Sequence, residues 1–181
     1  AYYKAVYDNF IDPLDEIYST NASGVLESYS THDNPLADNS LDGGKGGCFT
    51  GDTQILMSDG SYKAIEDIKE GDEILTKAHE WSSELVPGEV TGKVEHFVTE
   101  YLVFNEDLEV TDVHVVFVNG AWDVAGNVKP GDVLLDLDGS EIVIESIRKV
   151  VNPVWVYNFE VENYHTYFAD NFYVHNDKGG G

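Results

Sequence analysis

The chain has 181 residues and carries 34 acidic against 10 basic side chains, so its formal net charge is −24. This length suits one good-sized domain with a tail. So strong a negative charge disfavours nucleic acids and anionic membrane surfaces as partners, because both present phosphate groups. No apolar run is long enough to cross a bilayer, and the single cysteine, Cys48, excludes an internal disulfide.

Residues 1–47 differ in composition from the rest of the chain. An aromatic and aliphatic stretch predicts one short helix or strand before Pro13. From about Ser19 onward the segment is rich in Ser, Asn, Asp, Thr and Gly, which is typical of a linker. We therefore expect little stable structure between Ser19 and Gly47, and we treat residues 1–47 as an upstream flank. Because the sequence starts at Ala1 rather than at Met, we expect it to be cut from a longer protein.

Residues 48–176 have the pattern of an all-β domain. Short apolar segments alternate with turn signals, and no long amphipathic helix is apparent. The signals that favour tight hairpins are the dipeptides Asp59-Gly60, Asn119-Gly120 and Asp138-Gly139. A less regular stretch is expected over residues 76–92, which include a Pro-Gly pair.

The end of this domain predicts three strands separated by polar turns. The first strand ends near Val161 and alternates large apolar residues with mixed ones, and the second covers residues 164–168. The third leads into His175 and Asn176. Residues 177–181 have no core-forming capacity, so a packed strand ends on His-Asn and a loose tail begins at the next bond.

The sequence also repeats itself within the domain. Seven pairs of identical or similar residues share one offset of 60 positions without a gap. The pairs are Gly60/Gly120, Tyr62/Trp122, Ile68/Val128, Lys69/Lys129, Gly71/Gly131, Asp72/Asp132 and Leu75/Leu135. A shared register over this many positions favours duplication over chance reuse of Gly-Asp turns. Two similar β units would then pack about a pseudo-twofold axis, which can bring distant ends of the chain together.

The two ends of the domain carry residues that can react. An Asn side-chain amide can attack its own backbone carbonyl and close a succinimide, which breaks the bond to the next residue. A neighbouring His can move the proton that this reaction requires. Taken alone, His175-Asn176 reads as a strand that ends in two polar residues. It gains meaning from Cys48, a nucleophile that stands at the first position of the domain.

Three segments of the domain together resemble a known family. They are CFTGDTQILMSDG at the start, VTDVHVVFVNGAWDVAGNVKPGDVLL in the middle and VYNFEVENYHTYFADNFYVHN at the end. In order and spacing they are similar to intein-type (Hint) domains, with bacterial intein-like domains of type A and toxin-associated Hint modules as the nearest branches. The resemblance covers residues 48–176. It implies a horseshoe-shaped all-β fold with an internal pseudo-twofold repeat, whose ends lie side by side.

The resemblance also implies self-cleavage at two bonds. At the first, Cys48 would attack the carbonyl of Gly47 and turn the amide into a thioester, once the thiol has lost its proton. His114 would protonate the departing nitrogen, and Thr111 would hydrogen-bond the oxyanion or the scissile amide. A lone histidine is more often a core residue. Within a T-x-x-H motif between these partners, we favour catalysis.

At the second bond, Asn176–Asp177, His175 and His165 are the candidates to activate Asn176. His165 stands at the position where related domains carry a second catalytic histidine. The alternative is that His165 only fills space as an aromatic residue between Tyr164 and Tyr167. The remaining histidines match no motif and are interpreted as surface or linker residues; they are His32, His79 and His96.

Two residues depart from the pattern of splicing inteins. Many of those have Asp where this chain has Asn158, which can hydrogen-bond but cannot exchange a proton near neutral pH. Asn is common there in toxin-type Hint modules. Splicing inteins are followed by Ser, Thr or Cys, whereas Asp177 is a poor acyl acceptor. We therefore predict cleavage at Gly47–Cys48 and Asn176–Asp177 with little or no splicing, and release of the thioester by water or by an external thiol or amine.

Other functions fit parts of the sequence. A catalytically silent Hint domain could act as a spacer or interaction module in a large bacterial secreted or surface protein, but the complete set of candidate residues argues against decay. Asp136-Leu137-Asp138-Gly139 suggests calcium, yet it lacks the further ligands of a calcium loop and fits a hairpin turn better. Hedgehog-like sterol transfer is not expected, because that branch does not use a terminal His-Asn. We expect no cofactor and no metal, and the chain's own flanks as substrate.

Overall fold

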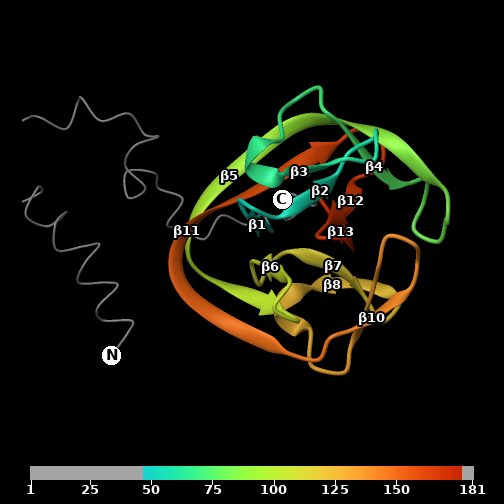
Figure 1. Cartoon of the computed structure of the whole chain (residues 1–181). Coiled ribbons are helices and arrows are strands. Elements are labelled where there is room, and N and C mark those ends of the chain that lie inside the picture. The colour runs from blue at the N-terminus through green and yellow to red at the C-terminus, as the bar shows by residue number, and fades with distance from the viewer. Residues whose placement is uncertain (1–46, 177–181) are drawn as a thin grey trace, which may run out of the picture. The chain divides into compact units, whose positions relative to one another are not determined.

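The computed structural model describes residues 47–176, where almost every ordered element is a β-strand (Figure 1). In chain order the elements are β1 (Phe49–Thr50), β2 (Gln54–Leu56), β3 (Tyr62–Ala64), η3 (Ile65–Asp67), β4 (Glu73–Lys77), β5 (Leu85–Phe104), β6 (Leu108–Val110), β7 (Val115–Val118), β8 (Ala121–Val124), η4 (Ala125–Asn127), β9 (Val133–Leu135), β10 (Glu141–Val143), β11 (Ile147–Val161), β12 (Thr166–Ala169) and β13 (Phe172–His175). The 3₁₀ helices η3 and η4 are single turns, and no helix in the described range is long and apolar enough to cross a membrane. The all-β prediction is confirmed. The element expected before Pro13 and the expected linker up to residue 46 lie outside the described residues.

The longest strands, β5 and β11, form a curved ribbon that wraps around the shorter strands (Figure 1). They pair antiparallel from Phe104↔Ile147 to Val90↔Val161, with two irregularities along the way. Irregularities of this kind increase the local twist and bend a ribbon. Strands β4, β6 and β1 extend the ribbon into a five-stranded sheet with the order β11-β1-β6-β5-β4.

The prediction of an irregular stretch over residues 76–92 is wrong for most of its length. Strand β4 continues to Lys77, β5 begins at Leu85, and Leu75 pairs with Pro87 between them. The Pro-Gly pair signals a break in the sequence, but at this point β5 pairs with β4 on one side, beyond the end of its pairing with β11. The missing N–H of Pro87 can therefore lie on the side without a partner strand.

A second sheet carries the end of the domain. Its order is β10-β9-β7-β13-β12-β2-β3, with β8 paired to β7. The hairpin of β12 and β13 lies in its middle, between β2 from the first half and β7 from the second. The ring of Tyr167 in β12 also packs on Phe49 of β1. The last strands are thus held between both halves and close to the strand that follows Cys48.

The two halves repeat the same local structure at the offset seen in the sequence. Helices η3 and η4 correspond to each other, and each leads into a turn with a glycine in the left-handed region. Gly71 has φ 85° and Gly131 has φ 98°, and their N–H groups each donate at 2.8 Å, to the carbonyls of Val90 and Ile144. A side chain would be strained at this φ. The predicted internal pseudo-twofold repeat is confirmed.

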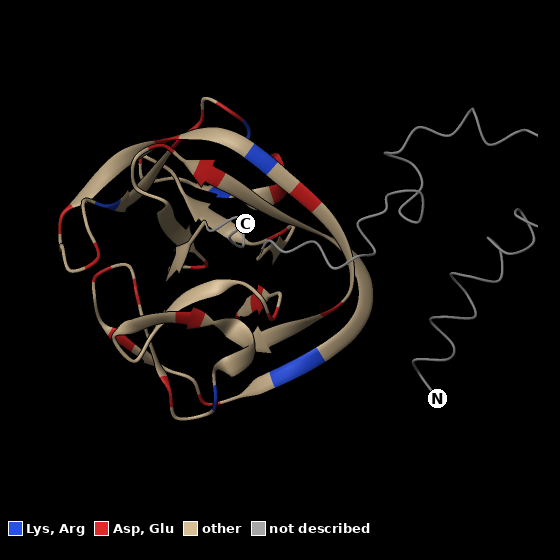
Figure 2. Cartoon of the chain, turned by 180° about the vertical axis from the view of Figure 1, so that it is seen from behind, with Lys and Arg blue, Asp and Glu red and all other residues tan. Residues whose placement is uncertain are grey.

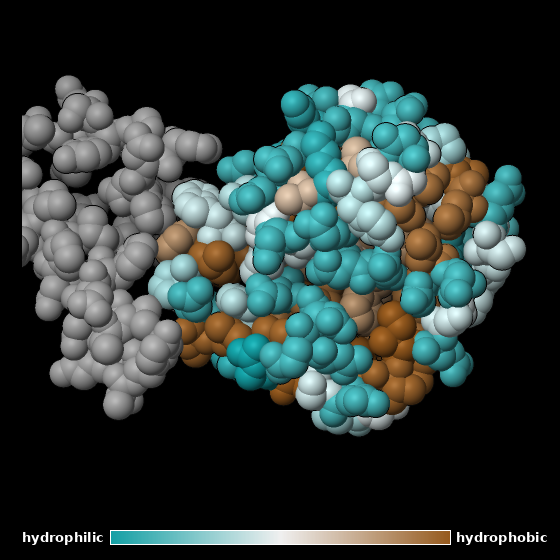
Figure 3. Space-filling model, viewed as in Figure 1, coloured by the Kyte–Doolittle hydropathy of each residue, from teal (hydrophilic) through white to brown (hydrophobic). Residues whose placement is uncertain are grey.

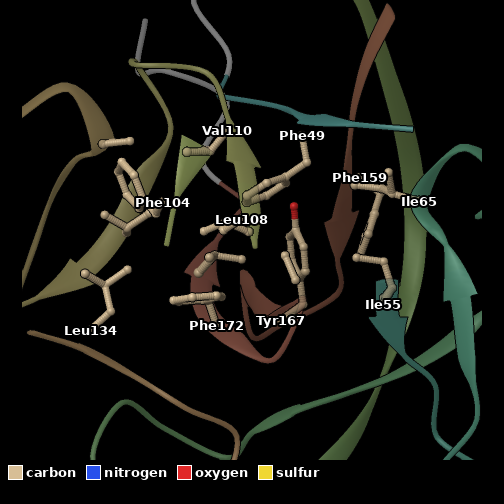
Figure 4. Packing of buried hydrophobic residues seen from close by; sticks show 14 of the residues in the cluster. Phe49, Ile55, Ile65, Phe104, Leu108, Val110, Leu134, Phe159, Tyr167 and Phe172 are labelled. Carbon is tan, nitrogen blue, oxygen red and sulfur yellow. The ribbon is translucent and has the colours of Figure 1, made fainter. Parts of the chain in front are cut away.

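The core fills the inside of the ribbon with aromatic and aliphatic side chains from both sheets (Figure 4). Tyr167 is fully buried and packs against Phe159 and Phe49, with ring centroids 4.2 and 6.2 Å apart. Burial of such large apolar surfaces is the main stabilising contribution to the fold. Burial of Tyr167 also places its phenol hydroxyl in the interior, where the hydroxyl needs a hydrogen-bond partner.

Charged side chains are spread over strands and turns instead of being gathered in one patch (Figure 2). Ion pairs join Lys63 to Asp72 at 2.6 Å and Arg148 to Glu106 at 2.7 Å, and surface pairs of this kind contribute about 0–1 kcal/mol each. Some apolar residues remain visible among the hydrophilic ones on the face shown in Figure 3. Of the large apolar side chains described, Trp81 is the most exposed, at 70%.

Candidate active site

The peptide unit at Cys48 is held by Thr111, the residue after β6. The N–H of Cys48 donates to Thr111 Oγ1 at 2.9 Å, and the N–H of Thr111 donates back to the carbonyl of Cys48 at 2.9 Å. The hydroxyl of Thr111 also donates to that carbonyl, at 3.3 Å. Strand β1 pairs with β6 through Phe49↔Val110. The hydrogen bonds between Cys48 and Thr111 therefore continue this strand pairing by one residue. The nitrogen of the Gly47–Cys48 amide is therefore fixed by a side-chain oxygen.

The carbonyl of the same amide is held by Asn158, a buried residue of β11. Its Nδ2 donates to the oxygen of Gly47 at 2.6 Å. Its Oδ1 accepts two hydrogen bonds, from the N–H of Phe159 at 2.8 Å and from the hydroxyl of Tyr167 at 2.7 Å. Two donors on Oδ1 fix the orientation of the amide, so that only the NH₂ group can face the carbonyl of Gly47.

Tyr167 is the site residue that the sequence interpretation missed. The only signal in the sequence is a tyrosine among aromatic residues that fill the core. A buried tyrosine hydroxyl usually has a partner, but the sequence does not say which one. The structure gives that partner as Asn158, 9 positions earlier in the chain.

His114 lies directly against Gly47. The histidine is buried at the end of a turn in which its N–H donates to the carbonyl of Thr111 at 3.1 Å. A Cβ atom at residue 47 would collide with the backbone of His114 and would lie 2.5 Å from its Nδ1. Only glycine fits at residue 47 with His114 in this position.

Cys48 and His114 are both neutral near pH 7. Burial raises the pKa of the Cys48 thiol to about 12. Burial also lowers the pKa of His114 to about 4; the backbone of Gly47 opposes this shift, and the charge on His175 adds to it. Neither ring nitrogen of His114 has a well-directed hydrogen bond to a described residue, although the pKa responds to nearby backbone groups. The ring thus lies near the backbone of Gly47 and His175 without a well-directed hydrogen bond to either. Its nitrogens can therefore accept and donate a proton.

The depressed pKa of His114 predicts that the fold weakens in mild acid. Between the unfolded value of 6.5 and the folded value of about 4, the unfolded chain binds a proton that the folded chain excludes. The free energy of unfolding therefore falls as the pH drops through this window, by up to about 3 kcal/mol. Asp170, whose pKa is raised by burial to about 6, acts in the opposite direction.

The measurement is guanidinium unfolding at pH 7 and pH 4.5 of the chain with Cys48→Ala and Asn176→Ala, which lacks both candidate reactive side chains. The same chain with His114→Gln is the matched control, since it retains Asp170 and every other acid. We expect a smaller loss of stability on acidification in the control. Equal losses in the two chains would contradict the assignment of this pH dependence to His114.

Asn176 closes the other end of the domain and is buried. Its N–H donates to the carbonyl of His165 at 2.9 Å. The side-chain amide of Asn176 is oriented so that it makes two hydrogen bonds. Its Nδ2 donates to the carbonyl of His165 at 2.8 Å, and its Oδ1 accepts from the N–H of Val161 at 2.8 Å. Backbone groups on two segments thus fix the orientation of the Asn176 amide.

The two candidate histidines near Asn176 have different surroundings. The ring of His175 is half-buried against Trp122, with centroids 5.1 Å apart, and its charge influences the pKa of His114. The side chain of His165 is exposed, and its ring lies 6.4 Å from that of His175. His165 has a left-handed φ of 58° and contacts Asn176 through its backbone carbonyl.

The structure thus brings most of the sequence-predicted residues into one connected region. They are Gly47, Cys48, Thr111, His114, Asn158, His175 and Asn176, with the backbone of His165 at its margin. His79 is exposed and His96 is half-buried on β5, while His32 and Asp177 lie outside the described residues.

Metal ligands do not gather at this site. Residues 47–176 contain no group of three or more His, Cys, Asp or Glu side chains that could hold a metal ion. The acidic string Asp136-Leu137-Asp138-Gly139 forms the turn between β9 and β10, in which the N–H of Gly139 donates to the carbonyl of Asp136 at 3.0 Å.

Comparison with known proteins gives one family and several similar structures. The family model described as pretoxin HINT domain matches residues 55–177. The bacterial intein-like domain from Clostridium thermocellum is 33% identical, with a TM-score of 0.65 over 71% of this chain and 98% of that one. The DnaB intein from Synechocystis sp. is 20% identical, with a TM-score of 0.60 over 72% of this chain and 99% of that one, a likeness of fold alone.

Curated proteins with similar sequences are much longer than the matched region. The Tiggy-winkle hedgehog protein of Danio rerio is 32% identical over 118 residues, which is 58% of this chain and 28% of that protein. The Sonic hedgehog protein of Xenopus laevis is 23% identical over 130 residues, 65% of this chain and 29% of that protein. The chain thus spans less than a third of the length of these relatives.

Proposed function

The chain belongs to the pretoxin HINT domain family, as the resemblance in its sequence indicated, and we propose that it cuts itself at Gly47–Cys48 and at Asn176–Asp177. The intein-like fold supports an autoprocessing type of function in general. The proposal of cleavage at these two bonds is supported mainly by the hydrogen bonds of the Gly47–Cys48 amide. Its N–H donates to Thr111, and its carbonyl accepts from Asn158.

The first step is an acyl shift from nitrogen to sulfur. The Cys48 thiol gives its proton to His114, and the sulfur attacks the carbonyl carbon of Gly47. The negative charge that develops on the carbonyl oxygen is stabilised by Nδ2 of Asn158, which already donates to this oxygen. His114 then passes the proton to the departing nitrogen, the C–N bond breaks, and a thioester with a free amine remains.

The neutral state of both groups suits this step. A thiol with a pKa of about 12 and an imidazole with a pKa of about 4 do not exchange a proton at rest. The proton therefore moves only as the new C–S bond forms, which keeps the precursor intact until the carbonyl is correctly placed. The thioester that results is released by water or by an external thiol or amine, since Asp177 is a poor acceptor.

The second step closes a succinimide at Asn176. Its Nδ2 attacks its own carbonyl carbon and loses one proton, while the nitrogen of Asp177 gains one and departs. We assign this proton relay to the ring of His175. His165 contributes its backbone carbonyl, which accepts from Nδ2 and orients it, and its exposed ring is assigned no proton. Ligation of the two flanks is minor or absent in this scheme.

The test is the intact mass of freshly purified protein, incubated with and without dithiothreitol. We expect separate products for residues 1–47, 48–176 and 177–181, with the first cut accelerated by the thiol. Cys48→Ala should block the first cut and Asn176→Ala the second. A joined product of 1–47 and 177–181 would contradict the expectation of little splicing. An unchanged mass over days, across pH and with calcium or chelator, would overturn the proposal and leave a spacer or interaction module.

A further inference from the structure

Trp122 of β8 packs directly against the ring of His175, and the chemistry above gives this tryptophan no role. The two rings are nearly perpendicular, with centroids 5.1 Å apart and planes at 78°. Trp122 also packs on Tyr173, two positions before His175 in β13, with centroids 5.3 Å apart. The indole therefore contacts two side chains that share one face of β13.

The position of this indole is fixed from the first half of the domain. Its Nε1 donates to Oε1 of Glu80 at 2.6 Å, across 42 positions of the sequence. Glu80 belongs to the loop between β4 and β5. The next residue, Trp81, packs against Phe117 of β7 with centroids 5.3 Å apart, and Trp122 packs on the same ring at 5.0 Å. The loop thus contacts the β7–β8 hairpin at two points, and one of them is the residue that lies against His175.

The internal repeat places an aromatic residue in a similar role in the other half. Tyr62 is the repeat-related residue of Trp122, and its hydroxyl donates to Oδ1 of Asn171 at 2.7 Å. Asn171 lies in the turn between β12 and β13. Tyr62 therefore contacts this hairpin at its turn, whereas Trp122 contacts it at the end that carries His175.

A proton relay at the second bond requires an imidazole of fixed orientation. In the proposed second step, the ring of His175 takes a proton from the Asn176 amide and gives one to the departing nitrogen, so it must face both atoms. His175 is the last residue of β13, and its side chain is only half-buried. Such a side chain keeps more rotamer freedom than one in the core, unless a neighbour restricts it.

The surroundings of His175 also contain charged and titratable side chains. A pocket of about 370 Å³ beside its ring is lined by Lys77 and His79 as well as by Glu80 and Trp122. Two routes therefore lead from Glu80 to His175, one through the indole and one through the charge of the carboxylate. An uncharged acceptor at residue 80 separates them, because it keeps the hydrogen bond and removes the charge.

We propose that Trp122 is a positioning residue for the second cut, held by Glu80 so that the ring of His175 keeps the orientation that proton transfer needs. The proposal rests on the proposed function, because it concerns the histidine that carries the proton in the second step. It adds a role for the loop between β4 and β5, which lies far from Asn176 in the sequence.

The first test measures both cuts in a chain with Glu80→Ala. Glu80 is exposed, so this substitution leaves the core intact. We expect release of 177–181 to slow about fivefold, the effect of one lost hydrogen bond, and release of 1–47 to change much less. Glu80→Gln keeps an oxygen that can accept from the indole and should restore the parent rate. If Glu80→Gln is as slow as Glu80→Ala, the carboxylate acts through its charge and the proposal is overturned.

The second test changes the indole itself. Trp122→Phe keeps an aromatic ring but has no N–H for Glu80, so it should slow the second cut by a similar factor. Adding Glu80→Ala should have no further effect, because the hydrogen bond is already absent. Trp81→Phe is the matched control, since Trp81 packs on the same Phe117 ring, and it should leave both rates unchanged. A second cut as slow in the control as in Trp122→Phe would mean that packing on β7 explains both results, and the positioning role would be lost.

The third test does not depend on cleavage. In the full chain with Cys48→Ala and Asn176→Ala, NMR should show nuclear Overhauser effects between the ring protons of Trp122 and His175. Glu80→Ala should weaken them and speed the exchange of the indole Nε1 proton with water, whereas Glu80→Gln should do neither. Absence of these effects before any change at Glu80 would overturn the proposal even if the parent chain cuts both bonds. If the parent cuts neither bond but the effects respond as expected, the proposed function fails while the hold on the His175 ring stands.

Discussion

His114→Ala is expected to slow thioester formation at Gly47–Cys48 by about 10² to 10⁴-fold, the usual contribution of a general acid and base. The ring lies against Gly47, and the proposed first step assigns to it the transfer of the proton from sulfur to nitrogen. Without it, the amine must leave as an anion or must collect its proton from water. The measurement is the amount of residues 1–47 released per unit time in excess hydroxylamine, which captures each thioester as it forms.

The second cut serves as an internal reference in the same samples. His114 does not touch the Asn176 amide, so the release of 177–181 should change much less than the release of 1–47. His96→Ala, a half-buried histidine on β5, is the matched control and should leave both rates unchanged. If His114→Ala releases 1–47 at the parent rate, the proton is carried by another group and the mechanism proposed for the first step is wrong.

The pH dependence of the first step provides a further mark of His114. The imidazole is a proton acceptor only while neutral, and its pKa is lowered to about 4 mainly by burial. The rate should therefore hold level through the neutral range and fall below about pH 4, provided the fold persists. A fall centred on 6.5 would instead indicate a solvated histidine.

The repeat explains why so much of the fold can be read from the sequence. Gly71 and Gly131 stand in register, and each marks a left-handed turn that only glycine adopts without strain. Local turn chemistry therefore indicates the limits of the neighbouring strands and the register of the repeat. The pair Pro87-Gly88 led to the wrong prediction of an irregular stretch. A proline fits in a strand when its missing N–H lies on the unpaired side, and which side is unpaired depends on the tertiary structure.

The site is less predictable than the fold for a related reason. The resemblance to intein-type domains indicated Cys48, His114 and Asn158 as candidate site residues. The protonation states of Cys48 and His114 depend on burial, which raises the pKa of the thiol and lowers that of the imidazole. No sequence motif records burial. The left-handed turn at His165, which presents a backbone carbonyl to Asn176, is likewise invisible in the side chains.

Asn158 provides the second large expected effect. Asn158→Ala removes the donor that lies 2.6 Å from the Gly47 oxygen, and the loss of one oxyanion donor costs about 10² to 10³-fold in rate. Asn158→Asp keeps the shape but replaces the NH₂ group with a carboxylate oxygen, which repels the developing negative charge. We therefore expect Asn158→Asp to be at least as slow as Asn158→Ala at pH 7, measured by the same hydroxylamine trapping.

Tyr167→Phe separates orientation from hydrogen-bond donation. It leaves Nδ2 in place and removes one of the two donors that fix the amide, so the rate should fall by only about fivefold, in keeping with the loss of about 1 kcal/mol for one neutral hydrogen bond. In the Asn158→Ala background the same change should have no further effect, because the group that Tyr167 orients is absent. Tyr101→Phe, at a buried tyrosine outside the site, is the control. An Asn158→Ala chain as fast as the parent would show that the carbonyl of Gly47 needs no donor from this position.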